Sequence, residues 1–189
     1  MIRHLPLLLV LGTLALTGCG GPGGGSPQAV FERAKAAAKN EDYHELMNCI
    51  HVDDVKNFAS VMVTMTQKLQ ALSQAPIAPN MIKELMEKFE NVLKKHNITR
   101  DKTFDINQVA NVRGLAADMM EVGKDFTNST LPIPQTSFSA AYRDATLGEV
   151  KINGDKATGS IASGERTSTI HFRNEGGRWY IGLPNRIPQ

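Results

Sequence analysis

The residue with the most distinctive chemical setting is Cys19, a thiol that directly follows a short apolar run near the start of the chain. That run, Leu5–Leu16, comes after the positive charge of Arg3, and the small residues Thr17 and Gly18 separate it from the thiol. A basic start, an apolar centre and small residues are the layout of an export signal, with cleavage before the cysteine. About twelve helical residues cover only about 18 Å, well short of the ~30 Å bilayer core, so this run is a poor permanent span.

The four residues Leu16-Thr17-Gly18-Cys19 resemble the lipobox of bacterial lipoprotein precursors. In that class the cysteine thiol receives a diacylglyceryl group, and cleavage then exposes its amino group, which is usually acylated as well. The resemblance implies that residues 1–18 are a signal peptide and that lipid on Cys19 anchors the protein, because two or more acyl chains hold stably where one holds marginally. The alternatives are an ordinary secretory signal with an accidental Cys19, and a retained signal anchor.

The residues after the cysteine, Gly20–Ser26, are almost all glycine, so residues 19–26 are expected to form a lipidated cysteine and a flexible tether. Seven such residues have an r.m.s. reach of roughly 15 Å, which predicts a domain close to the bilayer with little fixed orientation. Gly20 stands where enterobacterial lipoproteins of the inner membrane carry an aspartate. The resemblance therefore implies a protein anchored outside the cytoplasm, on the periplasmic side of the outer membrane if the host has two membranes.

Charge and cysteine content limit the functions open to residues 27–189, which we expect to form a single domain. The chain has 21 Lys and Arg against 19 Asp and Glu, a formal charge of +2, and losing Arg3 with the signal leaves +1. A nearly neutral protein lacks the electrostatic footprint of a nucleic-acid binder. With Cys19 lipidated, Cys49 has no intramolecular partner, so it is a buried structural thiol or, alternatively, a reactive thiol or intermolecular bridge.

His44, Cys49 and His51, close to Asp53 and Asp54, are the residues whose types suit a metal ion. Their His-x4-Cys-x-His spacing matches no standard zinc signature, and three such positions on one short helix do not converge. His44 and His51 are seven residues apart and share a helix face, for which a solvated surface is the preferred interpretation. We therefore expect no metal site and no cofactor.

Acid–base catalysis would need a carboxylate or histidine inside an apolar pocket that tunes its pKa. The candidates on or near the expected strands are Tyr142, Asp144, His171 and Tyr180. Nothing in their arrangement matches a catalytic motif, and the chain has no Gly-x-Ser-x-Gly nucleophile elbow. We expect no catalytic residue, with an acid–base enzyme or a small-molecule pocket as the alternative.

Apolar residues that recur every three to four positions predict about five helices within residues 27–126. The expected spans are about 27–40, 42–50, 55–72, 81–95 and 106–126. The most regular pattern is an a/d stripe made of Val55, Phe58, Met62, Met65, Leu69 and Leu72. We expect this stripe to pack within a helical hairpin, with a dimer seam as the alternative.

Residues 136–184 are expected to be β-rich, after a proline-marked linker over 127–135. Asn153-Gly154 is the strongest short hairpin signal, and glycine turns near 164 and 176 separate further alternating runs. Ile170 and Phe172 share one face of such a run, as do Trp179 and Ile181 of the next. The pattern predicts an antiparallel meander of about four strands that is apolar on one side.

The stretches 27–43, 150–157 and 176–181 resemble small exported proteins with a nuclear transport factor 2-like fold, in which a bent sheet wraps around helices as a cone. The resemblance implies an α+β domain whose N-terminal helices pack on a curved C-terminal sheet. Residues 54–126 depart from that pattern as a methionine-rich helical insert, which would fill or cover the pocket of the cone. Binding of an envelope protein through this insert is the expected function, and a structural envelope protein that dimerises is a further alternative.

Overall fold

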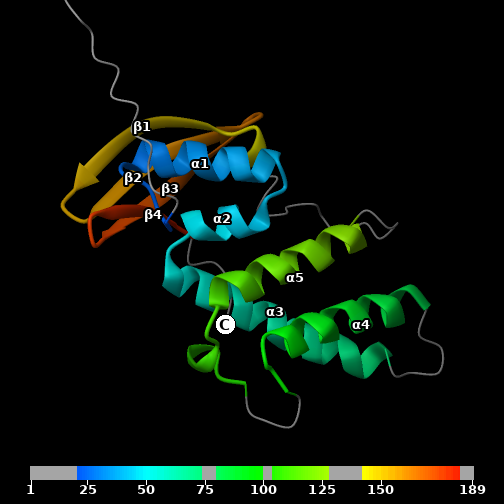
Figure 1. Cartoon of the computed structure of the whole chain (residues 1–189). Coiled ribbons are helices and arrows are strands. Elements are labelled where there is room, and N and C mark those ends of the chain that lie inside the picture. The colour runs from blue at the N-terminus through cyan, green and yellow to red at the C-terminus, as the bar shows by residue number, and fades with distance from the viewer. Residues whose placement is uncertain (1–20, 74–79, 100–103, 128–141, 184–189) are drawn as a thin grey trace, which may run out of the picture.

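The computed structural model describes residues 21–73, 80–99, 104–127 and 142–183, and shows the expected α+β architecture (Figure 1). The signal peptide, Cys19 and nearly all of the expected linker lie outside these described residues. The elements in chain order are α1 Pro27–Lys39, α2 Tyr43–Cys49, α3 Val52–Ser73, α4 Asn80–Lys95, the 3-10 helix η1 Ile106–Gln108, α5 Val112–Thr127, β1 Thr146–Asn153, β2 Lys156–Ser163, β3 Arg166–Glu175 and β4 Arg178–Gly182.

Local capping explains where the first two helices begin. The Ser26 hydroxyl accepts a hydrogen bond from the Ala29 N–H at 3.1 Å, and Pro27 follows as the first helical residue. The Asp42 carboxylate caps α2 in the same way, accepting from the Glu45 N–H at 2.9 Å. Both helix starts agree with the prediction from the sequence.

The sheet is a four-stranded antiparallel meander in the order β1-β2-β3-β4, as predicted. Each hairpin turns through two residues, and the first turn places Gly154 at φ 61°, a left-handed conformation that favours glycine. Phe172 pairs with Ile181 across β3 and β4, and both side chains are buried on the same face. This face is the apolar side that the alternation predicted.

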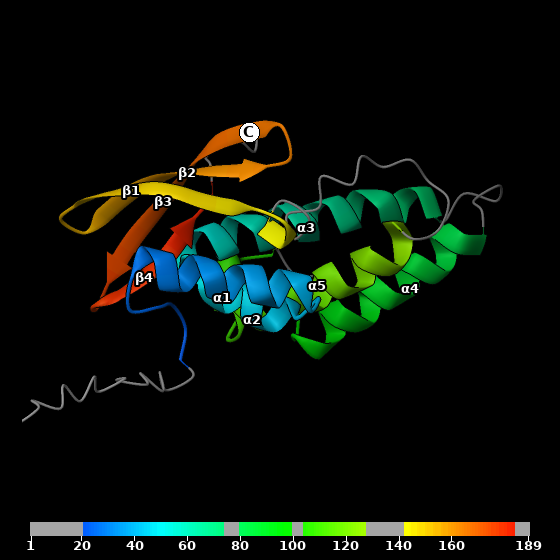
Figure 2. The same cartoon turned by 90° about the horizontal axis from the view of Figure 1, so that it is seen from above.

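The helices form two groups around the sheet. Helix α1 packs against β1 and β4, and α2 lies beside both α1 and α5 (Figure 1). Helices α3, α4 and α5 pack on one another and extend to one side of α1 and the sheet, which Figure 2 shows from above. The helical insert therefore forms a bundle of its own, which α2 joins to α1 beside the sheet.

The buried face of α3 differs from the predicted a/d stripe. Among the α3 side chains that the structure describes, the fully buried apolar ones are Val55, Ala59 and Val63, which follow an i, i+4 row. Phe58 and Met62 are only half-buried, and Met65 is 51% exposed. A straight helix has 3.6 residues per turn rather than 3.5, so the face that meets α4 and α5 includes the small Ala59. The side chains of Leu69 and Leu72 lie outside the described residues.

The predicted start of the last helix, at residue 106, was wrong. The chain instead forms η1, breaks, and begins α5 at Val112. The Asp105 carboxylate accepts from the Asn107 N–H, and the Asn111 side chain accepts from the Gly114 N–H at 2.9 Å, so each side chain caps a separate helix. Within the part of the chain that the structure describes, none of these helices is long and apolar enough to cross a membrane.

Candidate functional site

The segment Gly21–Ser26, here called the strap, is bound to the domain and is not a free tether. The Gly24 N–H donates to the Trp179 carbonyl at 2.8 Å, and the Trp179 N–H donates back to the Gly24 carbonyl at 2.7 Å. The Gly23 N–H also donates to the Asn48 carbonyl at 2.8 Å. The strap therefore pairs antiparallel with β4, which corrects the expectation of a mobile linker with little fixed orientation.

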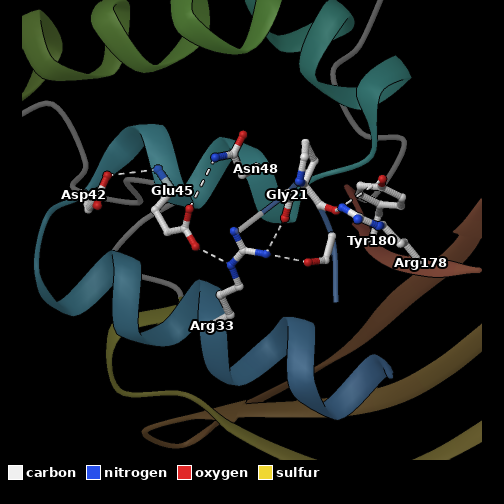
Figure 3. Close-up of polar contacts among 9 residues, drawn as sticks. Gly21, Arg33, Asp42, Glu45, Asn48, Arg178 and Tyr180 are labelled. Carbon is white, nitrogen blue, oxygen red and sulfur yellow. Dashed lines mark hydrogen bonds and ion pairs between the residues drawn. The ribbon is translucent and has the colours of Figure 1, made fainter. Parts of the chain in front are cut away.

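Arg33 of α1 holds the start of the strap (Figure 3). Its guanidinium donates to the Gly21 carbonyl at 2.8 Å and to the Gly23 carbonyl at 2.5 Å. The same group donates to the Glu45 carboxylate of α2, which the Asn48 amide also approaches. A planar guanidinium has several donors in a fixed fork, so one side chain can join α1, α2 and the strap.

β4 contributes a second set of contacts to the strap, also visible in Figure 3. Arg178 donates to the Pro22 carbonyl at 3.1 Å, and the Tyr180 hydroxyl lies 3.4 Å from the same oxygen. The guanidinium carbon of Arg113 in turn lies over the Tyr180 ring, 5.7 Å from the ring centroid. Arg113 belongs to α5 and also donates to the Ile50 carbonyl at 2.7 Å, which links the strap-binding strand to the helical bundle.

Two glycines of the strap, Gly23 and Gly24, lie so close to other parts of the domain that a side chain would not fit. Gly23 has φ 79°, and a Cβ atom there would lie 2.9 Å from the Trp179 carbonyl oxygen. A Cβ atom on Gly24 would lie 2.8 Å from the Val30 backbone nitrogen. Gly25 differs, since a Cβ atom there meets nothing within 4 Å. The glycine-rich composition therefore serves docking at Gly23 and Gly24, where the sequence suggested only flexibility.

Docking of the strap shortens the expected connection between Cys19 and the domain. Gly20 alone separates Cys19 from Gly21, the first docked residue. Two residue steps of extended chain span at most about 7 Å, compared with the reach of roughly 15 Å expected for a free tether. A lipid on Cys19 would therefore lie next to the face formed by the strap, Arg33 and Arg178.

The ion pair between Arg33 and Glu45 predicts a pH dependence of stability. The hydrogen bond from Arg33 holds the pKa of Glu45 below its ordinary value of 4.5. A carboxylate with a lowered pKa in the folded state contributes stability above its unfolded pKa and loses it as the pH falls through the folded pKa. We expect the urea midpoint of the wild type to fall below pH 4.5 more steeply than that of Glu45→Gln.

Glu32→Gln is the matched control for this measurement, because Glu32 is exposed on α1 and removal of its charge leaves Arg33 paired. Its urea midpoint should follow the wild-type curve. Equal pH slopes for the wild type and Glu45→Gln would contradict the assigned role of the pair.

The cysteine and histidines that the sequence offered as metal ligands do not converge. Cys49 is buried, as the structural interpretation predicted, and burial raises the pKa of its thiol to about 12, which disfavours a reactive thiolate. His51 is buried at the edge of the Tyr180 ring, and Asp54 accepts from the Leu183 N–H at 3.2 Å. His44 points elsewhere, toward Asp118 of α5 at 3.3 Å.

The four acid–base candidates also lie in different environments. Tyr142 is buried with its ring 6.2 Å from that of Phe31, and burial raises the pKa of its hydroxyl. Asp144 and His171 are exposed, and the Tyr180 hydroxyl faces the strap. Among the described residues, these four therefore do not assemble a buried acid–base pair.

The inner face of the sheet is occupied by side chains. Phe172 is 1% exposed and Trp179 is 8% exposed, and both belong to the same core as Phe31 of α1 and Leu46 of α2. A sheet that lined an open pocket would leave such residues accessible, so this packing weighs against the small-molecule alternative. No protein-family model, curated protein or solved structure matches the chain.

Proposed function

We propose that the mature chain is a membrane-anchored lipoprotein of the cell envelope, held by lipid on Cys19, and that its domain binds a protein partner without catalysis. The lipobox-like residues Leu16-Thr17-Gly18-Cys19 support the anchoring. The strap would keep the domain close to that lipid, because it begins to dock two residues after Cys19. In a host with two membranes, the periplasmic side of the outer membrane is the proposed location.

The proposed binding surface is a second apolar row on α3. Phe58, Val61, Met62 and Met65 follow the i, i+3, i+4, i+7 spacing of a single helix face. Val61 is 38% exposed and Met65 is 51% exposed, whereas Phe58 and Met62 are half-buried against the core. A helix face of this spacing is the pattern that partner proteins recognise in a groove, and methionine adapts well to such a contact.

A charge placed on this row should remove partner binding. We expect Val61→Glu together with Met65→Glu to lose the protein that cross-links to the wild type in intact envelopes, because a carboxylate in an apolar contact must be desolvated without a partner. The folded domain should be unaffected, since both side chains are exposed. The measurement is cross-linking followed by affinity purification from detergent-solubilised envelopes.

Thr64→Glu is the matched control, since Thr64 is exposed on the same helix but outside the row. It should keep the cross-linked partner. If the partner survives Val61→Glu with Met65→Glu, or is lost equally in Thr64→Glu, the α3 row is not the binding surface. A cross-linked species that proves to be a second copy of the chain would favour the dimer instead.

A further inference from the structure

Helices α2 and α5 lie side by side and bring together three residues that can bind a metal ion (Figure 1). His44 of α2 and the carboxylates Asp118 and Glu121 of α5 offer ligand atoms that all lie within 4.8 Å of one another. Asp118 and Glu121 are three residues apart, which places them on one face of α5. The i, i+3 spacing of Asp118 and Glu121 is visible in the sequence. The sequence does not show that His44, on a distant helix, faces this pair.

Asp118 is held in a fixed orientation by groups behind it. Its side chain is 8% exposed, and its Oδ2 atom lies 2.7 Å from His96 Nε2 and 2.8 Å from Lys95 Nζ. Its Oδ1 atom is turned toward His44 Nε2 at 3.3 Å. Hydrogen bonds of this kind to one carboxylate oxygen orient the other oxygen for a metal and are typical of metal sites. His44 and Glu121 are exposed, so an ion can enter from solvent without a change in the fold.

We propose that His44, Asp118 and Glu121 bind one Zn²⁺ ion, with a fourth coordination position open to water. One imidazole and two carboxylates are ligands that first-row divalent cations accept, and three protein ligands with an open position are a known zinc arrangement. Lys95 opposes the ion by its charge, but its side chain is 63% exposed and can turn into solvent. The site links α2 to α5 and is independent of the lipid anchor and of the α3 row.

Zinc binding by the full chain, purified in detergent and stripped of metal, tests the proposal. Titration with Zn²⁺ against a chromophoric chelator should show one site per chain. His44→Ala and Glu121→Gln should each weaken binding by about tenfold or more, since even removal of an outer-shell partner costs 10–100-fold. Both side chains are exposed, so the variants should fold, and circular dichroism checks this.

His171→Ala and Glu149→Gln are the matched controls, because they remove an exposed histidine and an exposed carboxylate from the sheet. They should bind Zn²⁺ as the wild type does. The proposal is overturned if the wild type binds no zinc, if the double variant of His44→Ala and Glu121→Gln binds it equally, or if the controls lose as much affinity.

Discussion

Replacement of Cys19 by serine is expected to abolish fatty-acid labelling and to leave the chain at its uncleaved precursor length. Serine has no thiol to accept a diacylglyceryl group, so neither the lipid nor the cleavage that follows it in this class would occur. Metabolic labelling with a palmitate analogue measures the first effect, and the apparent mass on a denaturing gel measures the second.

Cys49→Ser is the matched control for this experiment, because it removes the other cysteine of the chain. The Cys49 thiol is buried and its pKa is raised, so it should carry no lipid in either protein. Label and cleavage should persist in Cys49→Ser. Undiminished labelling of Cys19→Ser would show that the lipobox resemblance misleads.

Replacement of Gly23 by valine is expected to release the strap and to lower the free energy of unfolding by about 2–3 kcal/mol. A branched residue at φ 79° is strained, and its Cβ would press on the Trp179 carbonyl and the Tyr180 ring. The loss is limited to what docking contributes, because the strap can leave while the core stays folded. Urea unfolding measures the change, and the Gly24 and Trp179 amides should exchange hydrogen faster.

Gly25→Val makes the same substitution two residues later, where a Cβ atom meets no neighbour. Its stability should stay within about 0.5 kcal/mol of the wild type, and its Trp179 amide should remain protected. Equal behaviour of the two variants would show that the strap contributes nothing to stability. Faster exchange of the Trp179 amide in Gly25→Val, but not in Gly23→Val, would show that docking of the strap depends on Gly25 and not on Gly23.

The secondary structure followed closely from local signals in the sequence. Ser26 and Asp42 cap α1 and α2, and Gly154 turns the first hairpin, because each acts on residues within a few positions of itself. The alternation in β3 and β4 also assigned Phe172 and Ile181 to the buried face. These features depend on periodicity and caps, which a sequence displays directly.

Contacts between distant residues could not be read in the same way. In the sequence the glycines of the strap look identical whether they are free or docked, because the groups that dock them, such as Arg33 and Trp179, lie far away along the chain. The group of His44 with Asp118 joins residues 74 positions apart, and neither has a local motif that points to the other. On α3, Ala59 was overlooked because its small side chain adds little to a hydrophobic pattern.

The pairing of Gly24 with Trp179 also determines how the protein would respond to a mechanical load. With the proposed lipid on Cys19, a force between the lipid and the domain would enter the fold at Gly21 and meet the strap first. A small set of hydrogen bonds, from the backbone and from Arg33 and Arg178, holds this segment, so it should yield while the hydrophobic core stays intact. Release of residues 21–26 would add about 20 Å of extended chain. With the proposed lipid on Cys19, the strap would therefore act as a reserve of chain length, letting the domain move away from the bilayer under tension and return when the tension ends.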